Sequence, residues 1–265
     1  MTFIDHLEEL RWHIIRSAIV IIVVGVIVFL QKSFVFDTLI FAPTKADFAT
    51  YRVLCKLSDA LHLGGLFCLE NVRFTFINIE LSAQFLIHLK VSLILGLVVS
   101  FPYISWEVWR FVKPALYDSE IKYTRGIVFF TSLLFLIGIS FGYYILTPFS
   151  LNFFGNYSVT QSVSNSFTFT NYIGFLTMFV LASGIIFELP MAVYFLSKIG
   201  LLTPRFMRDY RKHSMVGILF VSAIITPADV GTQLLVAVPV YVLYEMSIFI
   251  SAKVERDFER QFEKQ

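Results

Sequence analysis

Charged residues are scarce in this sequence. They make up 15% of its 265 residues, whereas hydrophobic residues make up 57%. This balance excludes a soluble domain, and the net charge of only +2 offers no basic surface suited to nucleic acid. The hydrophobic residues come in long blocks, which is typical of α-helices that cross a membrane. A membrane β-barrel would instead show alternation over segments of about ten residues. The composition therefore predicts an all-α, polytopic membrane protein.

Residues that commonly catalyse reactions or bind metals are also few. The chain has two cysteines, too few for an iron–sulfur cluster held by four thiolates, and its five histidines are scattered. The metalloprotease motif H-E-x-x-H, the nucleophile motif G-x-S-x-G and the Walker motif for phosphate binding are all missing from the sequence. We therefore expect no enzyme activity, no metal and no cofactor.

Six hydrophobic runs predict six transmembrane helices in a single domain that covers residues 1–265. The fifth run is short against the roughly twenty residues that a helix needs to cross a bilayer, and we expect helices five and six to be short. The predicted spans are about 14–30, 81–103, 126–147, 172–196, 214–226 and 233–251, with an outer loop over 31–80 and a cytoplasmic loop over 104–125.

Lysine and arginine are missing from two of the predicted connections. Residues 149–171 and 227–232 contain neither, whereas the connections that alternate with them and the C-terminal tail are basic. Cytoplasmic segments of membrane proteins carry the excess of Lys and Arg, so both termini are predicted to be cytoplasmic. Residues 31–80 also contain basic residues, but long loops weigh little in this rule.

The segment Phe101–Glu120 separates two hydrophobic runs and mixes aromatic with charged residues, as membrane interfaces do. Pro102 and Pro114 predict that no regular helix continues through it. Residues 2–11 predict a short amphipathic helix ahead of the first span. Carboxylates stand out on this basic face and would suit a cationic partner, because neighbouring guanidinium groups need separate carboxylates. They are Glu8, Glu9, Glu107, Asp118 and Glu120.

Glu188 is an ionisable residue well inside the fourth predicted span, two residues before Pro190. A carboxyl group at that depth should be protonated, paired or facing water. It would suit a proton relay, as in a transporter, and it would equally suit a protonated side chain that holds two helices together. The residues alone leave both interpretations open.

Short motifs follow one another along nearly the whole chain. They are HLEELR at His6–Arg11, FAP at Phe41–Pro43, SFP at Ser100–Pro102, VWRFVKPALY at Val108–Tyr117 with Glu120, FELP at Phe187–Pro190, TPAD at Thr226–Asp229 and PVYVLYE at Pro239–Glu245. In these motifs, and in their order, the chain resembles the TatC family, the signal-peptide receptor of the twin-arginine protein translocase.

The resemblance implies six helices in a concave, glove-like bundle in the bacterial cytoplasmic membrane. It implies that folded proteins with twin-arginine (RR) signal peptides dock on the cytoplasmic face and are exported by the proton-motive force. The implied partners are single-span TatA-type and TatB-type proteins and other copies of the chain. By this likeness, Glu9, Arg11, Phe111 and Glu120 bind the signal peptide, Glu188 is the intramembrane polar residue, and Pro43 and Asp229 are functional on the outer face.

The two cysteines, Cys55 and Cys68, lie in the predicted outer loop, where the chain departs from the family. Disulfides persist outside the cytoplasm, and Gly64 and Gly65 permit a tight reversal between the cysteines. We predict a Cys55–Cys68 bridge, with two buried thiols as the alternative.

Two other functional classes compete with the family assignment. A proton-coupled secondary transporter would use Glu188, but the sequence shows no internal repeat and no matching pair of interrupted helices. A membrane enzyme would use Glu188 or Glu120 as an acid or base, but Glu120 has no histidine or nucleophile near it in the sequence.

Overall fold

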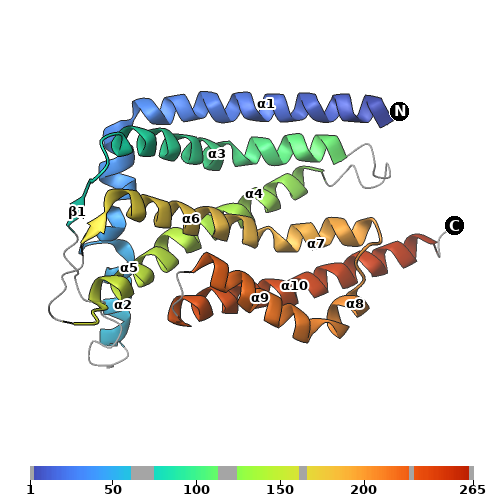
Figure 1. Cartoon of the computed structure of the whole chain (residues 1–265). Coiled ribbons are helices and arrows are strands. Elements are labelled where there is room, and N and C mark those ends of the chain that lie inside the picture. Colours follow the sequence, from blue (N-terminus) through green and yellow to red (C-terminus); the bar gives the residue numbers. More distant parts are fainter. Residues whose placement is uncertain (1–2, 61–74, 113–123, 161–165, 227–229, 263–265) are drawn as a thin grey trace. The chain divides into compact units, whose positions relative to one another are not determined.

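A computed structural model describes residues 3–60, 75–112, 124–160, 166–226 and 230–262. These residues are almost entirely helical (Figure 1). The helices are α1 (Phe3–Leu30), η1 (Phe34–Ile40), η2 (Ala42–Thr44), α2 (Ala49–Ala60), α3 (Ala83–Val112), α4 (Thr124–Phe141), η5 (Gly142–Leu146), α5 (Thr147–Asn156), α6 (Phe169–Phe187), α7 (Leu189–Lys198), α8 (Pro204–Asp209), α9 (Arg211–Ile225) and α10 (Val230–Phe262). The strands are β1 (Phe76–Ile77) and β2 (Phe167–Thr168).

Five helical stretches in the described part of the chain are long and apolar enough to cross a membrane. They are Glu8–Leu30, Ala83–Val112, Gly126–Asn156, Phe169–Lys198 and Val230–Asp257. Helix α9 has only 15 residues, and it corresponds to the short fifth run of the sequence. The predicted class, a polytopic helical membrane protein, is confirmed.

Two helices at the start of the chain are longer than predicted. Residues 2–11 do not form a separate amphipathic helix, because α1 runs without a break from Phe3 to Leu30. Helix α3 continues through Pro102 to Val112, so residues 104–112 are helical and not part of a loop. Proline removes one backbone donor, but membrane helices tolerate this loss where neighbouring groups satisfy the carbonyl it leaves.

The third predicted span and the last one also extend further. Pro148 does not end the third span, because a π-helical turn, η5, leads directly into α5. The Thr147 hydroxyl donates to the Gly142 carbonyl at 2.9 Å, and the Thr147 backbone N–H bonds to the same oxygen. Helix α10 continues past residue 251 to Phe262, so the last helix is not short.

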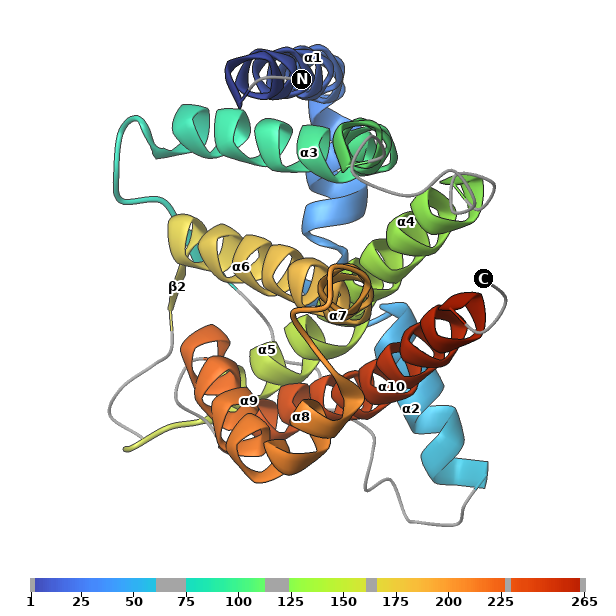
Figure 2. The ribbon, with the colours of Figure 1, turned by 90° about the vertical axis from the view of Figure 1, so that its right-hand side faces the viewer.

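The chain forms two compact units. The first comprises Met1–Leu133 with Leu151–Thr177, and the second comprises Leu134–Ser150 with Met178–Gln265. In the first unit, α1 and α3 run antiparallel and side by side (Figures 1 and 2). Their backbones approach closely at Gly96, where an added Cβ would lie 2.8 Å from the Ile21 carbonyl oxygen and 3.0 Å from the Gly25 Cα. Small residues allow such contacts between membrane helices.

Beyond the α1–α3 pair, the first unit contains a compact aromatic cluster. The rings of Phe41, Phe76, Phe169 and Tyr172 lie within contact distance, and the Tyr172 hydroxyl donates to the Ile40 carbonyl at 2.5 Å. Strands β1 and β2 pair in parallel beside these rings, with Phe76 opposite Phe167. This strand pair was not predicted from the sequence.

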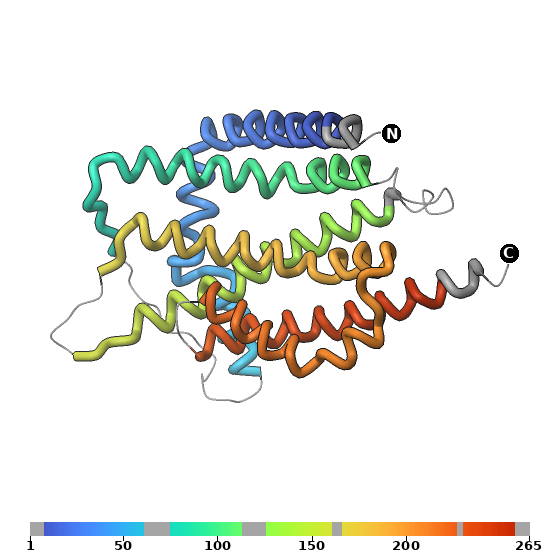
Figure 3. The backbone as a smooth tube through the Cα atoms, turned by 45° about the vertical axis from the view of Figure 1, so that its right-hand side comes forward, coloured from blue at the N-terminus to red at the C-terminus, as the bar shows by residue number. Residues whose placement is uncertain are grey.

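In the second unit, α7, α8 and α9 pack on α10, and Figure 3 shows α8 and α9 beside it. The Tyr244 hydroxyl of α10 donates to the Met207 carbonyl of α8 at 2.7 Å, and Ser197 donates to Ser251 at 2.8 Å. Gly138 lies against the Ser183 carbonyl, so α4 and α6 also meet through a small residue.

Replacing Gly96 with alanine should separate α1 from α3. Since the new methyl group would meet backbone atoms, which cannot move aside cheaply, we expect a loss of stability of about 1–3 kcal/mol. The matched control is Gly174→Ala in α6, where no neighbouring atom lies within 4 Å of an added Cβ. Thermal unfolding in detergent should show a lower melting temperature for Gly96→Ala alone, and equal melting of both variants would contradict the close contact.

Candidate functional site

Because α1 and α3 are antiparallel, the first turns of α1 lie beside the last turns of α3. We call this region, residues 8–13 of α1 and 103–112 of α3, the α1–α3 end. It brings His13 next to Glu107, although 94 residues separate them in the sequence. It also contains the three described residues to which the family resemblance assigns signal-peptide binding, Glu9, Arg11 and Phe111.

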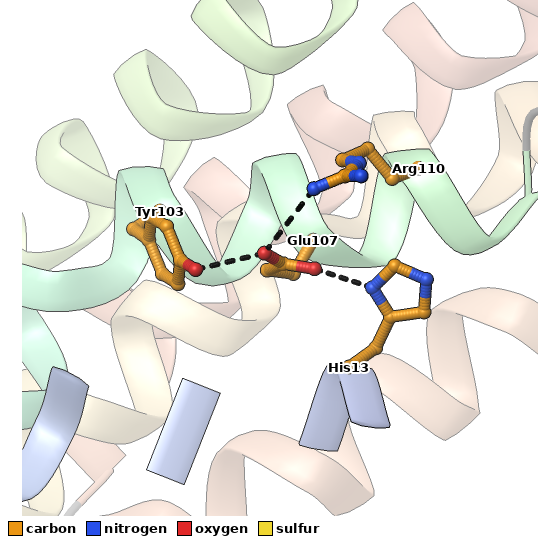
Figure 4. A network of polar contacts seen from close by, with 4 residues as sticks. All are labelled: His13, Tyr103, Glu107 and Arg110. Atoms are coloured by element: carbon orange, nitrogen blue, oxygen red, sulfur yellow. Dashed lines mark hydrogen bonds and ion pairs between the residues drawn. The ribbon is translucent and has the colours of Figure 1, made fainter. Parts of the chain in front are cut away.

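Glu107 forms the centre of a polar network at the α1–α3 end (Figure 4). Its side chain is 1% exposed. The Tyr103 hydroxyl donates to its Oε1 at 2.8 Å, and His13 donates from Nδ1 to its Oε2. Arg110 adds a positive charge, with Nη1 3.8 Å from Oε1. A buried carboxylate is costly unless it is paired and hydrogen-bonded, and here both oxygens have partners.

The prediction that Glu107 faces a cationic partner at the surface is therefore wrong. Its carboxylate is buried and already occupied by groups of the same chain. Tyr103 and Arg110 precede and follow it by four and three residues, so their contacts could have been inferred from helical spacing. His13 was missed, because nothing in the sequence marks a partner so far along the chain.

Aromatic rings surround this network. The Phe111 ring meets the His13 ring edge to face, with 6.1 Å between their centroids. The Arg110 guanidinium lies over the Trp106 ring at 4.9 Å, and Trp106 is 42% exposed. A cation above an aromatic face gains a favourable interaction with the ring quadrupole. Phe111 is thus in contact with the histidine that binds Glu107.

The acidic residues of α1 differ in what they contact. Glu8 is exposed and lies 3.9 Å from Arg11, whose guanidinium also lies 5.8 Å from the Trp12 ring centroid. Glu9 is partly exposed and has no hydrogen bond or ion pair among the described residues. It precedes His13 by one helical turn, so both lie on the same face of α1. Glu120, the other predicted binding carboxylate, lies outside the described residues.

Pro43, predicted to be functional on the outer face, is fully buried in η2. The Tyr51 hydroxyl donates to its carbonyl at 2.9 Å. Burial raises the pKa of Tyr51 to about 12, so this donor keeps its proton at physiological pH. Asp229 lies outside the described residues. Cys55 lies in α2, but Cys68 lies outside the described residues, so the disulfide stays a prediction.

Glu188 lies in the second unit, where it separates α6 from α7. Its backbone N–H bonds to Ile185, and its carbonyl accepts from Met191 and Ala192, so the chain bends through one turn and continues as a helix. The Oε1 atom is buried and has no hydrogen-bond partner in the part of the chain that the structure describes. The predicted fourth span, about 172–196, corresponds to the helical stretch Phe169–Lys198, but the interruption at Glu188 was not predicted.

An ion pair in the second unit joins α9 to α10. Arg211 donates to Glu245 at 2.7 Å, and the Tyr241 hydroxyl donates to the other oxygen of Glu245 at 3.1 Å. Glu245 ends the PVYVLYE motif, which does not indicate these partners. Among the described residues, no three His, Cys, Asp or Glu side chains gather in a way that could hold a metal ion.

These observations define a multi-spanning helical membrane protein with a buried polar network where two of its spans meet. Comparison with known proteins identifies the family of this membrane protein. The model of the Sec-independent protein translocase protein (TatC) family matches residues 5–239. The chain therefore belongs to the TatC family and is a component of a Sec-independent protein translocase.

Relatives from bacteria match over nearly the whole chain. The Sec-independent protein translocase protein TatC of Blattabacterium sp. subsp. Periplaneta americana is 38% identical over 97% of both chains. The TatC protein of Aquifex aeolicus is 32% identical over 97% of both chains. A crystal structure described as the twin arginine translocase receptor TatC in DDM matches with a TM-score of 0.73 and 31% identity, covering 93% of this chain and 99% of that chain.

The effect of replacing Glu188 on protein export should depend on whether the new side chain is polar. Glutamine preserves the shape and a polar atom at the buried Oε1 position, so we expect Glu188→Gln to retain most activity and Glu188→Leu to lose it. Export of a folded reporter, in cells whose own copy is deleted, provides the measurement. If glutamine abolished export as fully as leucine, Glu188 would need to titrate for function.

Proposed function

We propose that this chain is the receptor subunit of a twin-arginine translocase. It binds RR signal peptides of folded proteins at the cytoplasmic face and nucleates their export, which the proton-motive force drives. Its partners are single-span TatA-type and TatB-type proteins and further copies of itself in the bacterial cytoplasmic membrane. The role is that of a receptor and not of an enzyme.

The arrangement of carboxylates at the α1–α3 end carries this proposal. Glu107 is enclosed and satisfied, whereas Glu9 has no partner in the described chain and lies one turn from the His13–Phe111 contact. A partly exposed carboxylate one helical turn from such a ring contact suits a guanidinium group, which forms forked hydrogen bonds with carboxylates and stacks on rings. Glu120 would supply the second carboxylate that a pair of arginines requires.

The proposed orientation, with both termini in the cytoplasm, has support from the distribution of charge. Arg11 and Arg110 belong to the α1–α3 end, and Arg205, Arg208 and Lys212 are exposed around α8 and the start of α9. Basic residues flank the cytoplasmic ends of membrane spans. The α1–α3 end then faces the compartment in which signal peptides are made.

Photocrosslinking tests the receptor function directly. A synthetic signal peptide with a photoreactive residue next to its RR pair is added to purified protein in detergent, in parallel with a KK version. We expect a strong adduct with RR and a weak one with KK, because lysine carries a point charge and cannot form forked bonds. Equal adducts with both peptides would refute the proposed recognition.

Single substitutions should then show which acidic residues contribute to peptide binding. Glu9→Ala and Glu120→Ala should each weaken RR-peptide binding by about 1–3 kcal/mol, with smaller losses where water screens the charge. Glu8→Ala is the matched control, because Glu8 is adjacent, exposed and paired with Arg11. Affinities can be measured by fluorescence anisotropy of a labelled peptide. Unchanged affinity in both the Glu9 and Glu120 variants would remove these residues from the site.

A further inference from the structure

We propose that His13 and Glu107 are positioning residues for the signal-peptide site. Their hydrogen bond fixes how α1 is rotated and shifted along α3, and so holds Glu9 and Phe111 in a productive arrangement. This inference rests on the proposed receptor function, and it concerns residues that do not themselves touch the peptide.

The first support is that the peptide has little access to the pair. Glu107 is 1% exposed and His13 is 9% exposed, measured on their side chains. Both carboxylate oxygens already accept hydrogen bonds from the same chain. An arginine of the peptide could reach Glu107 only by displacing His13 or Tyr103, which would leave a buried group without its partner.

The second support is that His13 connects all parts of the site that the structure describes. Its Nδ1 donates to Glu107 of α3, and its ring edge meets Phe111 one turn further along α3. It also shares a face of α1 with Glu9, one turn away. Any rotation of α1 that moved Glu9 would therefore break the bond to Glu107 and separate His13 from Phe111.

The third support is that the other contacts between α1 and α3 are poorly suited to fix rotation at this end. Gly96 packs against Ile21 and Gly25 further along α1, and His88 stacks on Phe29 near the opposite end of the pair, with ring centroids 3.9 Å apart. Apolar packing between membrane helices tolerates small shifts, whereas a buried polar pair specifies one register. The hydrogen bond at His13 specifies the register where Glu9 and Phe111 lie.

The test compares four variants in RR-peptide binding and in thermal unfolding. His13→Met removes the donor. His13→Met with Glu107→Met replaces the pair with apolar side chains of similar volume, a change that often preserves stability. His13→Gln keeps a donor that can reach the carboxylate. His88→Gln is the matched control, because it alters a histidine of the same helix pair that lies far from the α1–α3 end.

The positioning role predicts that the double methionine variant melts like the wild-type chain but binds the RR peptide about tenfold more weakly, since small misplacements of binding groups are costly. His13→Met should also bind weakly. His13→Gln should restore most of the affinity, and His88→Gln should bind like the wild type.

Two results would overturn this role. If the double methionine variant bound the RR peptide with wild-type affinity, the pair would be structural only. If His13→Met bound more tightly, Glu107 would be a direct ligand that His13 normally covers. Failure of the receptor function itself would give a different result from failure of the positioning role alone. In that case the wild-type chain would bind RR and KK peptides equally, and the positioning role would fail with it.

Discussion

The carboxylate of Glu107 imposes the constraint on which the α1–α3 end depends. A buried charge is tolerated only where hydrogen bonds and opposite charges compensate it. Tyr103 and Arg110 belong to the same helix as Glu107, so a movement of α3 does not separate them from it. His13 comes from α1, so the first helix cannot shift or rotate without leaving this carboxylate short of a partner.

This constraint matters because α1 packs mainly on α3 and otherwise presents exposed side chains. Side chains along much of α1, including Ile19, Ile22 and Val26, are more than half exposed in the described structure, as suits a helix that faces lipid. Lipid tails are as apolar as these side chains, so helix association depends on close packing and polar contacts. Gly25 and Gly96 supply the close packing, and the His88 Nε2–H adds a bond to the Phe29 carbonyl at 3.1 Å. These contacts hold the rest of the pair, whereas the His13–Glu107 bond holds the α1–α3 end.

Much of the fold followed from the sequence, because long hydrophobic runs and ordered motifs report the spans and the family directly. The prolines gave a wrong indication, since Pro102 lies inside α3 and Pro148 lies inside the continuous helical stretch formed by α4, η5 and α5. Glu9, Arg11 and Phe111, to which the family motifs assign signal-peptide binding, all lie at the α1–α3 end in the structure. The enclosure of Glu107 was not predictable, because its burial results from a contact with a residue 94 positions away.

The positioning role requires that the His13–Glu107 bond stays intact while a signal peptide is bound. Nuclear magnetic resonance of protein labelled with ¹⁵N only in its five histidines tests this directly, with His13 assigned from its loss in the His13→Gln variant. If His13 and Glu107 position the site, the hydrogen-bonded Nδ1–H signal of His13 persists when saturating RR peptide is added. Disappearance of that signal, or its shift to the position of an unbonded imidazole on peptide binding, would show that the pair opens and does not position the site.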